Sequence, residues 1–315
     1  MPRDESNKSA ILVMYSTAPP TTRHLQRLVE IGGHRDVVVA DSEHRAMQTA
    51  SRAEIILGHR YLWQVLPTAQ RLAWVQSSAG GIDHLLVPDL FIRSPILTRC
   101  PIFGEVIAWH ALALALTLSR GLHGVGRPDE SVREVQPTEL PQTAMIFGMG
   151  EIGQPLGRLL VGMGVRVIGV NRSGIADPGC FNTILRVEDP WEEFVQQVDL
   201  LFICCPATTE THKIISANVL DHLSDSAILV NVGRGQVIDY EAIIAHLKDG
   251  RISAGLDVLD GATEEEIKCL QALPNVICSQ KTASFHPSRQ ERFERFVESQ
   301  VERFVVQQPL LHRVH

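Results

Sequence analysis

The sequence predicts an α/β protein built on parallel sheets. Short apolar runs alternate with helical patterns along almost the whole chain, which is typical of strands joined by crossover helices. With 315 residues, 44% of them hydrophobic, the chain can form one large core or two ordinary ones. One polar, Gly- and Pro-containing stretch interrupts the alternation and divides it into two series.

The first series predicts a small doubly wound unit that ends near Pro101. The run AILVMYS (residues 10–16) is a buried strand, and a helical stretch follows it at residues 22–31. Segments that start at Glu43 and Tyr61 connect the strands. The remaining predicted strands are DVVVA (36–40), AEIILG (53–58) and LAWVQSS (72–78).

A long apolar helix over about residues 103–122 follows the first series, and a predicted loop at 123–142 separates this helix from the second series. An amphipathic helix at about 288–306 ends the pattern, and it can pack on either series. The predicted strands between them are TAMIFG (143–148), VRVIGV (165–170), DLLFICC (199–205), AILVNVG (227–233), ISAGLDV (252–258) and NVICSQ (275–280).

Charge and hydropathy argue against nucleic-acid and membrane partners. The formal net charge is -7, and no basic tract is present. The longest apolar run, residues 106–118, is too short to span a bilayer and contains His110. The polar start of the chain does not resemble a secretory signal.

The six cysteines are scattered, with no CxxC and no histidine partner at metal-ligand spacing. We therefore expect reduced thiols, a cytoplasmic location and no metal site. Cys204 and Cys205 are expected on opposite faces of the strand at 199–205.

A glycine-rich turn carries the strongest local signal. Gly148, Gly150 and Gly153 form G-x-G-x-x-G between a predicted strand and a predicted helix. The first glycine permits the tight turn, the second lets backbone amides approach a pyrophosphate, and the third allows helix and strand to pack closely. The pattern therefore predicts dinucleotide binding, although a glycine-rich turn of another α/β protein is the alternative.

The end of the next strand favours NADP(H). An acid at this point would bind the ribose 2′-hydroxyl of NAD, but this chain has Asn171, Arg172 and Ser173. An arginine beside small polar groups can hold a 2′-phosphate. Alternatively, Arg172 is a solvated turn residue and NAD(H) is used.

Several segments in order give the chain a family resemblance. VQSSAGGIDHL, FGMGEIG, CCPATTETHKII, NVGRGQVID and AGLDV, with the long helix, resemble the D-isomer-specific 2-hydroxyacid dehydrogenases of the glyoxylate/hydroxypyruvate reductase type. The resemblance implies a flavodoxin-like substrate-binding domain at 1–101, completed by 287–315. It also implies a Rossmann dinucleotide-binding domain at 102–286 and a homodimer formed through the 103–122 helix.

The same resemblance implies site residues. Arg234 is the expected substrate arginine, since a guanidinium after a strand can bind a carboxylate and polarise the adjacent carbonyl; a surface ion pair is the alternative. Ser78, Ala79, Gly80 and Gly81 would cradle the carboxylate. The implied cofactor-binding residues are Glu151, Ile152, Cys205, Pro206, Thr211, Val232, Gly233 and Asp257, beside the glycines and the 171–173 segment.

The catalytic position departs from the family. Gln280 and Lys281 stand where the family has Pro-His, and by spacing Ala262 takes the place of the glutamate that pairs with that histidine. Asp260 or Glu264, Glu265 and Glu266 could approach by loop movement, but they are first interpreted as an exposed acidic run and a helix start.

Lys281 is the candidate general acid. An ordinary lysine is charged near neutral pH and can protonate the alkoxide that forms when hydride reaches a ketone. The main hypothesis is an NADP(H)-dependent reductase of a small 2-keto acid. The alternatives are a cofactor-binding sensor or corepressor-like protein without turnover, and a nicotinamide enzyme that acts on another small anion.

Overall fold

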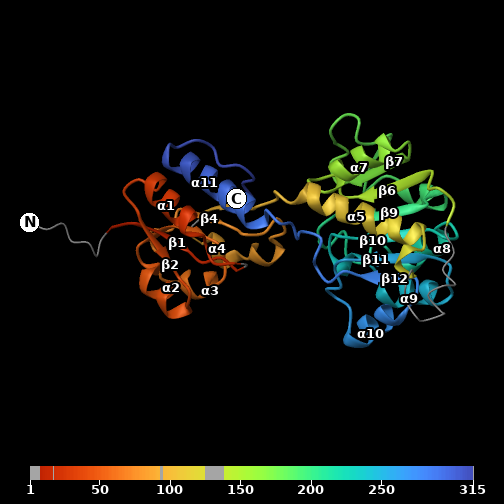
Figure 1. Ribbon diagram of the computed structural model, residues 1–315, viewed down its shortest axis with the longest axis horizontal. Coiled ribbons are helices and arrows are strands. Elements are labelled where there is room, and N and C mark those ends of the chain that lie inside the picture. The colour runs from red at the N-terminus through yellow and green to blue at the C-terminus, as the bar shows by residue number, and fades with distance from the viewer. Residues whose placement is uncertain (1–7, 17, 93–94, 125–137, 315) are drawn as a thin grey trace, which may run out of the picture. The chain divides into compact units, whose positions relative to one another are not determined.

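The computed structural model describes residues 8–16, 18–92, 95–124 and 138–314. The chain divides into two compact units, coloured by residue number in Figure 1. Unit 1 comprises Met1–Ile102 and His286–His315, and unit 2 comprises Phe103–Phe285. Most of the loop predicted at 123–142 lies outside the described residues.

Unit 1 contains a five-stranded, fully parallel sheet in the order β2-β1-β3-β4-β5. The predicted α/β class is confirmed. The sequence pattern missed β5, an edge strand of three residues. The strands are β1 (Ala10–Val13), β2 (Asp36–Val39), β3 (Ala53–Leu57), β4 (Trp74–Gln76) and β5 (Ile96–Thr98).

The C-terminal helix α11 (Arg289–Val305) packs beside α1 (Thr22–Ile31) in unit 1, as Figure 1 shows. Its apolar face buries Phe293, Val297 and Val301. This contact decides between the two positions that the sequence left open. The other helices of the unit are α2 (Glu43–Ala50), α3 (Leu62–Val65) and α4 (Pro88–Phe91), with a 3₁₀ turn, η2 (Asp83–Leu85).

A buried polar network joins α11 to α1. The imidazole of His24, which is fully buried, lies 2.7 Å from the carboxylate of Glu298 and 2.8 Å from the hydroxyl of Tyr15. Glu294 accepts hydrogen bonds from the backbone amide and the hydroxyl of Thr21. Burial, followed by the charges of Glu294 and Glu298, raises the pKa of Tyr15, so this hydroxyl stays neutral. The two ends of the chain are therefore tied together by specific contacts.

Unit 2 contains a seven-stranded parallel sheet in the order β12-β11-β10-β9-β6-β7-β8. Every residue of β6, β9 and β10 is buried, as expected for a parallel sheet covered on both faces. The strands are β6 (Thr143–Phe147), β7 (Arg166–Asn171), β8 (Thr183–Arg186), β9 (Leu200–Ile203), β10 (Ile228–Asn231), β11 (Ser253–Leu256) and β12 (Val276–Cys278).

Helices cover both faces of this sheet. Ala144 and Ile146 point toward α5 (Gly104–Ser119) and α7 (Gly153–Gly162), while Met145 and Phe147 point to the opposite face. That face carries η4 (Trp191–Gln197), α8 (Ala217–His222), α9 (Tyr240–Lys248) and α10 (Glu264–Ala272). None of the described helices has the length and apolar character needed to cross a membrane.

The cysteine pair requires a correction. The strand predicted at 199–205 ends at Ile203, so Cys204 and Cys205 lie just beyond β9. They still pack on opposite faces of the sheet, in the two different cores. All six cysteines are free thiols.

The topology of unit 2 indicates where a ligand would bind. β6 lies between β7 and β9, so the chain leaves β6 first toward one edge and later returns to the other. Ligands of open parallel sheets bind at the carboxyl ends of the strands at such a switch point. The glycine-rich turn follows β6 directly.

Candidate active site

The geometry after β6 requires glycine at two of the three motif positions, Gly148 and Gly153. Gly148 has φ +97°, and a Cβ there would lie 2.7 Å from the backbone of Cys204. A Cβ on Gly153 would lie 1.9 Å from the carbonyl oxygen of Gly148. A Cβ on Gly150 would meet open space, so backbone is accessible at this point. This combination fits a turn that a pyrophosphate approaches closely.

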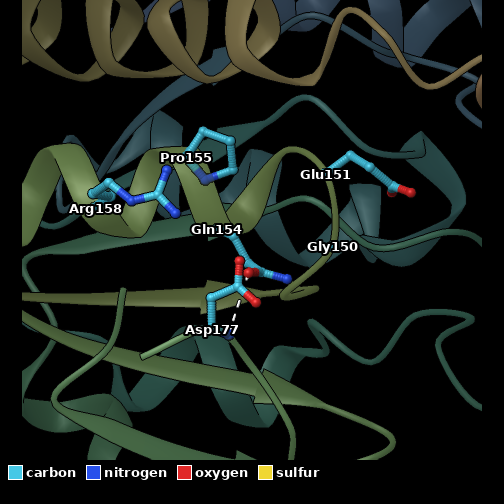
Figure 2. Close-up of a pocket in the computed structure, with 6 residues that line it drawn as sticks. All are labelled: Gly150, Glu151, Gln154, Pro155, Arg158 and Asp177. Atoms are coloured by element: carbon cyan, nitrogen blue, oxygen red, sulfur yellow. Dashed lines mark hydrogen bonds between the residues drawn. The ribbon is translucent and has the colours of Figure 1, made fainter. Parts of the chain in front are cut away.

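A cavity of about 390 Å³ lies at this turn and at the amino-terminal end of α7 (Figure 2). The amide of Asp177 donates to the side chain of Gln154, which in turn donates to the carbonyl of Met149. Because carboxylates also line the cavity, an anion there would depend on backbone amides and on Arg158. The lining residues are Gly150, Glu151, Gln154, Pro155, Arg158 and Asp177.

The end of β7 presents an exposed arginine. The side-chain oxygen of Asn171 accepts from the amide of Gly174 at 2.6 Å, and this bond shapes the turn. Arg172 and Ser173 are exposed. Hydrogen bonds from Thr208 and the local backbone, and then the charge of Arg172, lower the pKa of Glu210. Glu210 therefore lies in the vicinity of Arg172.

The turn after β9 is held by its own side chains. The hydroxyl of Thr211 donates to the carbonyl of Pro206 at 2.7 Å and accepts from the amide of Thr208 at 2.8 Å. Thr211 thus orders the segment that follows Cys205, which the sequence placed beside the cofactor.

Arg234 lies in a rigid turn after β10. The side chain of Asn231 accepts from the amide of Gly233 and donates to the carbonyl of Arg234. A Cβ on Gly235 would lie 2.2 Å from the carbonyl of Asp260, so the chain cannot carry a side chain there. The guanidinium of Arg234 is half-buried and donates to the carbonyl of Gly233 at 2.9 Å. Val232 and Gly233 are buried in the same turn.

Asp257, at the end of β11, organises the neighbouring turn. Its buried carboxylate accepts from the hydroxyl of Ser279 at 2.7 Å and from the amide of Ala283 at 3.1 Å. His110 of α5 lies 3.0 Å from the Ser279 hydroxyl and 3.8 Å from the carboxylate. In the sequence His110 stands out only as a break in an apolar run, because the pattern of α5 gives no sign of its partner.

Lys281 follows β12 in an unusual backbone conformation. Gln280 and Lys281 have φ values of +53° and +61°, in the left-handed region that residues with side chains rarely adopt. The amide of Lys281 donates to the carbonyl of Asp257 at 2.7 Å, which holds this turn. The side chain is 67% exposed, and its ammonium lies 3.6 Å from a carboxylate oxygen of Asp260.

The acidic run divides into two kinds of residue. Glu264, Glu265 and Glu266 form the first turn of α10, and Thr263 with Glu266 makes a capping box, as the helix-start interpretation predicted. Asp260 is different: its side chain is only 28% exposed, and it accepts from the amide of Gly235 at 3.2 Å. The interpretation of Asp260 as merely exposed was therefore wrong, because the Gly235 turn packs against it. Ala262 packs against the core.

In unit 1, a polar cluster lies after β3 and β4. The hydroxyl of Ser77 accepts from the amide of Ala79 and lies 3.3 Å from the ring of His59. Gly80 packs closely on Cys100, so a Cβ there would be 3.3 Å from its carbonyl. The buried hydroxyl of Ser78 has no hydrogen-bond partner within the part of the chain that the structure describes. Gly81, next in the chain, is partly exposed.

Histidines add to this cluster, and the sequence analysis did not identify them. The rings of His59 and His84 are 5.1 Å apart and edge-on. Burial, followed by the neighbouring His84, lowers the pKa of His59 to about 4, so His59 is neutral near physiological pH.

Comparison with known proteins agrees with this arrangement. Residues 112–283 match the family model of the D-isomer specific 2-hydroxyacid dehydrogenase NAD binding domain. A glyoxylate reductase of Korarchaeum cryptofilum is 31% identical over 252 residues, which are 75% of this chain and 74% of the relative. A glyoxylate reductase of Thermococcus gammatolerans is also 31% identical, over 65% of each chain.

Solved structures give the same result over nearly the full length. A D-isomer specific 2-hydroxyacid dehydrogenase family protein of Aeromonas salmonicida has a TM-score of 0.79 at 26% identity, covering 98% of this chain and 99% of its own. The NADPH-dependent glyoxylate/hydroxypyruvate reductase of Sinorhizobium meliloti, in complex with NADP and malonate, has a TM-score of 0.76 at 25% identity, covering 98% and 97%.

The fold and the site thus define a nicotinamide-dependent dehydrogenase. The chain belongs to the D-isomer specific 2-hydroxyacid dehydrogenase family, and unit 2 carries the NAD(P)-binding domain of that family.

Proposed function

We propose that the protein reduces a small 2-keto acid to the 2-hydroxy acid with NADP(H). One observation supports this most strongly: Arg234, Asp257 and Lys281 follow the adjacent strands β10, β11 and β12 in the sheet whose β6 carries the glycine-rich turn. Arg234 would bind the carboxylate of the substrate, Asp257 would orient the nicotinamide, and Lys281 would donate the proton. All three would then act at the carboxyl ends of adjacent strands. Related glyoxylate reductases support the substrate class.

The residues of this site have distinct tasks in the proposed reaction. The guanidinium of Arg234 binds the substrate carboxylate and polarises the adjacent carbonyl. The reduced nicotinamide supplies the hydride. Lys281 gives a proton from Nζ to the carbonyl oxygen, so that an N–H bond breaks and an O–H bond forms. Because its side chain is 67% exposed, Lys281 can regain a proton from water.

In unit 1, we assign the substrate-binding role to Ser78, Ala79, Gly80 and Gly81. Their small side chains let an anion approach the backbone at Gly80 and Gly81, while the amide of Ala79 donates to the Ser77 hydroxyl. The Ser78 hydroxyl is a buried donor that lacks a partner among the described residues. On this assignment unit 1 is the substrate-binding domain and unit 2 the dinucleotide-binding domain.

The cofactor assignment follows the glycine turn and the strand ends of unit 2. Arg172 selects the 2′-phosphate of NADP(H) in this proposal, and Asp257 meets the nicotinamide amide. The proposed cofactor-binding set is Gly148, Gly150, Glu151, Ile152, Gly153, Asn171, Arg172, Ser173, Cys205, Pro206, Thr211, Val232, Gly233 and Asp257.

Two further assignments concern the state of the protein in the cell. The six free thiols support a reducing, cytoplasmic compartment. The face of α5 that carries Trp109 and Leu116 is exposed and apolar, which supports a homodimer formed through this helix.

NADPH consumption with glyoxylate, hydroxypyruvate, pyruvate and bulkier 2-keto acids tests the function. We expect turnover with at least one small 2-keto acid. Lys281→Met, which keeps similar bulk, should lower the chemical rate by about 10²- to 10⁴-fold and leave NADPH binding intact. Binding of NADPH without reduction of any member of the panel would overturn the proposal and favour a cofactor-binding sensor.

A further inference from the structure

Asp260 contacts both the turn that carries Arg234 and the side chain of Lys281. One carboxylate oxygen accepts from the amide of Gly235, the residue after Arg234. The other lies 3.6 Å from the ammonium of Lys281 and makes no hydrogen bond within the described ranges. The same side chain therefore contacts both the turn after β10 and the residue after β12.

The surroundings of Asp260 keep it in place. A Cβ on Gly235 would lie 2.2 Å from the Asp260 carbonyl and 2.4 Å from the hydroxyl of Tyr240, so these three residues are in close contact. Burial first, then the charge of Asp260, and after these Glu266 and Cys278, raises the pKa of Tyr240. Tyr240 is thus a neutral neighbour, whereas Lys281 provides a positive charge.

The backbone of Lys281 is also fixed, although its side chain is exposed. Its amide donates to the carbonyl of Asp257, three residues before Asp260. Two consecutive left-handed residues each cost about 1–2 kcal/mol, which the surrounding hydrogen bonds must offset. The backbone is therefore fixed at both Lys281 and Asp260, and only the side chain of Lys281 has to be ordered for the two to pair.

We propose that Asp260 is the positioning residue for Lys281: its carboxylate directs the ammonium that donates the proton toward the Arg234 turn. The catalytic part of this inference rests on the proposed function. An imidazole needs a carboxylate to select its tautomer, whereas an ammonium needs one only to hold its direction and charge. Asp260 has a shorter side chain than the glutamate that the family pairs with its histidine. Because Asp260 also anchors the Gly235 turn, it meets that smaller requirement.

The test compares Asp260→Asn with the wild type. Asparagine keeps an acceptor for the Gly235 amide and removes the charge. Exposed ion pairs contribute about 0.2–1 kcal/mol, so an amine-acylating reagent should modify Lys281 roughly two- to fivefold faster in the variant, as measured by peptide mass spectrometry. Lys213, which pairs with Asp239, is the internal control, and Glu264→Gln is the matched variant.

Activity provides a second readout. In Asp260→Asn kcat should fall by the same two- to fivefold factor, while the affinity for NADPH stays constant. The substitution should have no effect on the rate in a Lys281→Met background, and Asp260→Glu should restore part of the wild-type rate.

The two readouts separate this inference from the proposed function. If the wild type reduces no keto acid, the proposed function fails, yet faster acylation of Lys281 in Asp260→Asn still supports the contact. An unchanged acylation rate, or an effect of Asp260→Asn that persists without Lys281, overturns the inference.

Discussion

Arg172 is the residue on which cofactor choice depends most directly. Its side chain is exposed after β7, and Asn171 holds the turn from which it projects. A charge-assisted phosphate contact contributes about 1.5–3 kcal/mol. We therefore expect Arg172→Ser to weaken NADPH binding by roughly ten- to a hundredfold and to change NADH binding little.

Fluorescence titration with both nucleotides measures this preference. Arg166→Ser, at the opposite end of β7, is the matched control and should leave both affinities unchanged. Equal affinities of the wild type for NADPH and NADH would contradict the assignment of Arg172.

His59 should make the stability of unit 1 depend on pH. In the unfolded chain a histidine takes up a proton near pH 6.5, but in the folded unit His59 stays neutral until about pH 4. Between these values the unfolded state binds more protons, so the free energy of unfolding falls as the pH decreases. The loss is on the order of 1–3 kcal/mol after allowance for solvent screening.

Denaturant unfolding between pH 4 and 7 checks this expectation. His59→Asn should flatten the pH dependence, whereas His44→Asn, at an exposed position of the same unit, should retain it. Identical slopes for wild type and His59→Asn would show that another group controls the acid sensitivity.

At the scale of single residues, the sequence predicted the roles that a local motif determines. Gly153 could be assigned because the carbonyl of Gly148, five residues earlier, excludes a side chain, and Gly148 could be assigned from the motif although its contact, Cys204, is distant in the sequence. Asp260, His59 and His110 could not, because their roles depend on Gly235, Ser77 and Ser279, which lie 18 or more residues away in the sequence. Periodicity contains no information about such long-range partners.

Among the secondary-structure elements, α5 has the clearest exposed apolar face. Glu105, Trp109, Ala113 and Leu116 are exposed at helical spacing, while the opposite side of the helix is buried against the sheet of unit 2. We expect the wild type to have about twice the chain mass of 34.9 kDa in solution and Trp109→Glu to be monomeric.

Size-exclusion chromatography with light scattering distinguishes the two states. Met163→Glu, another exposed apolar residue of unit 2, should not change the mass. A monomeric wild type would show that the exposed face of α5 does not form a dimer interface.

The elements that the sequence missed share a physical property. β5 and β8 each lie at one edge of their sheets, with three and four residues, and β8 alternates between half-buried and exposed positions. An edge strand packs on fewer neighbours, so it needs no continuous apolar run. The central strands are buried on both faces, and for that reason they stood out in the sequence.

At the scale of the whole molecule, unit 1 depends on the last helix. α11 supplies buried apolar residues and the carboxylates of Glu294 and Glu298 to α1. A chain that stops after Phe285 should therefore lose the structure of unit 1 and keep that of unit 2, whose sheet and covering helices all lie within 103–285.

Hydrogen exchange followed by mass spectrometry resolves the two units. In the shortened chain the amides of β1 and β3 should exchange rapidly, while those of β6, β9 and β10 should stay protected as in the full-length protein. Protection of β1 in the shortened chain would show that unit 1 is stable without α11.

The split composition of unit 1 also has a consequence for biosynthesis. The ribosome makes β1 to β5 first and α11 last, with all of unit 2 in between. At about 5–20 residues per second, the nascent amino-terminal segment waits roughly ten to forty seconds for its final helix. During that time Tyr15 and Trp74 lack the aromatic rings of α11 that they pack against, Phe293 and Phe304, whereas unit 2 can fold as soon as it emerges. The order of synthesis thus reverses the order of folding, and the newborn amino-terminal half is the part that molecular chaperones would have most reason to bind.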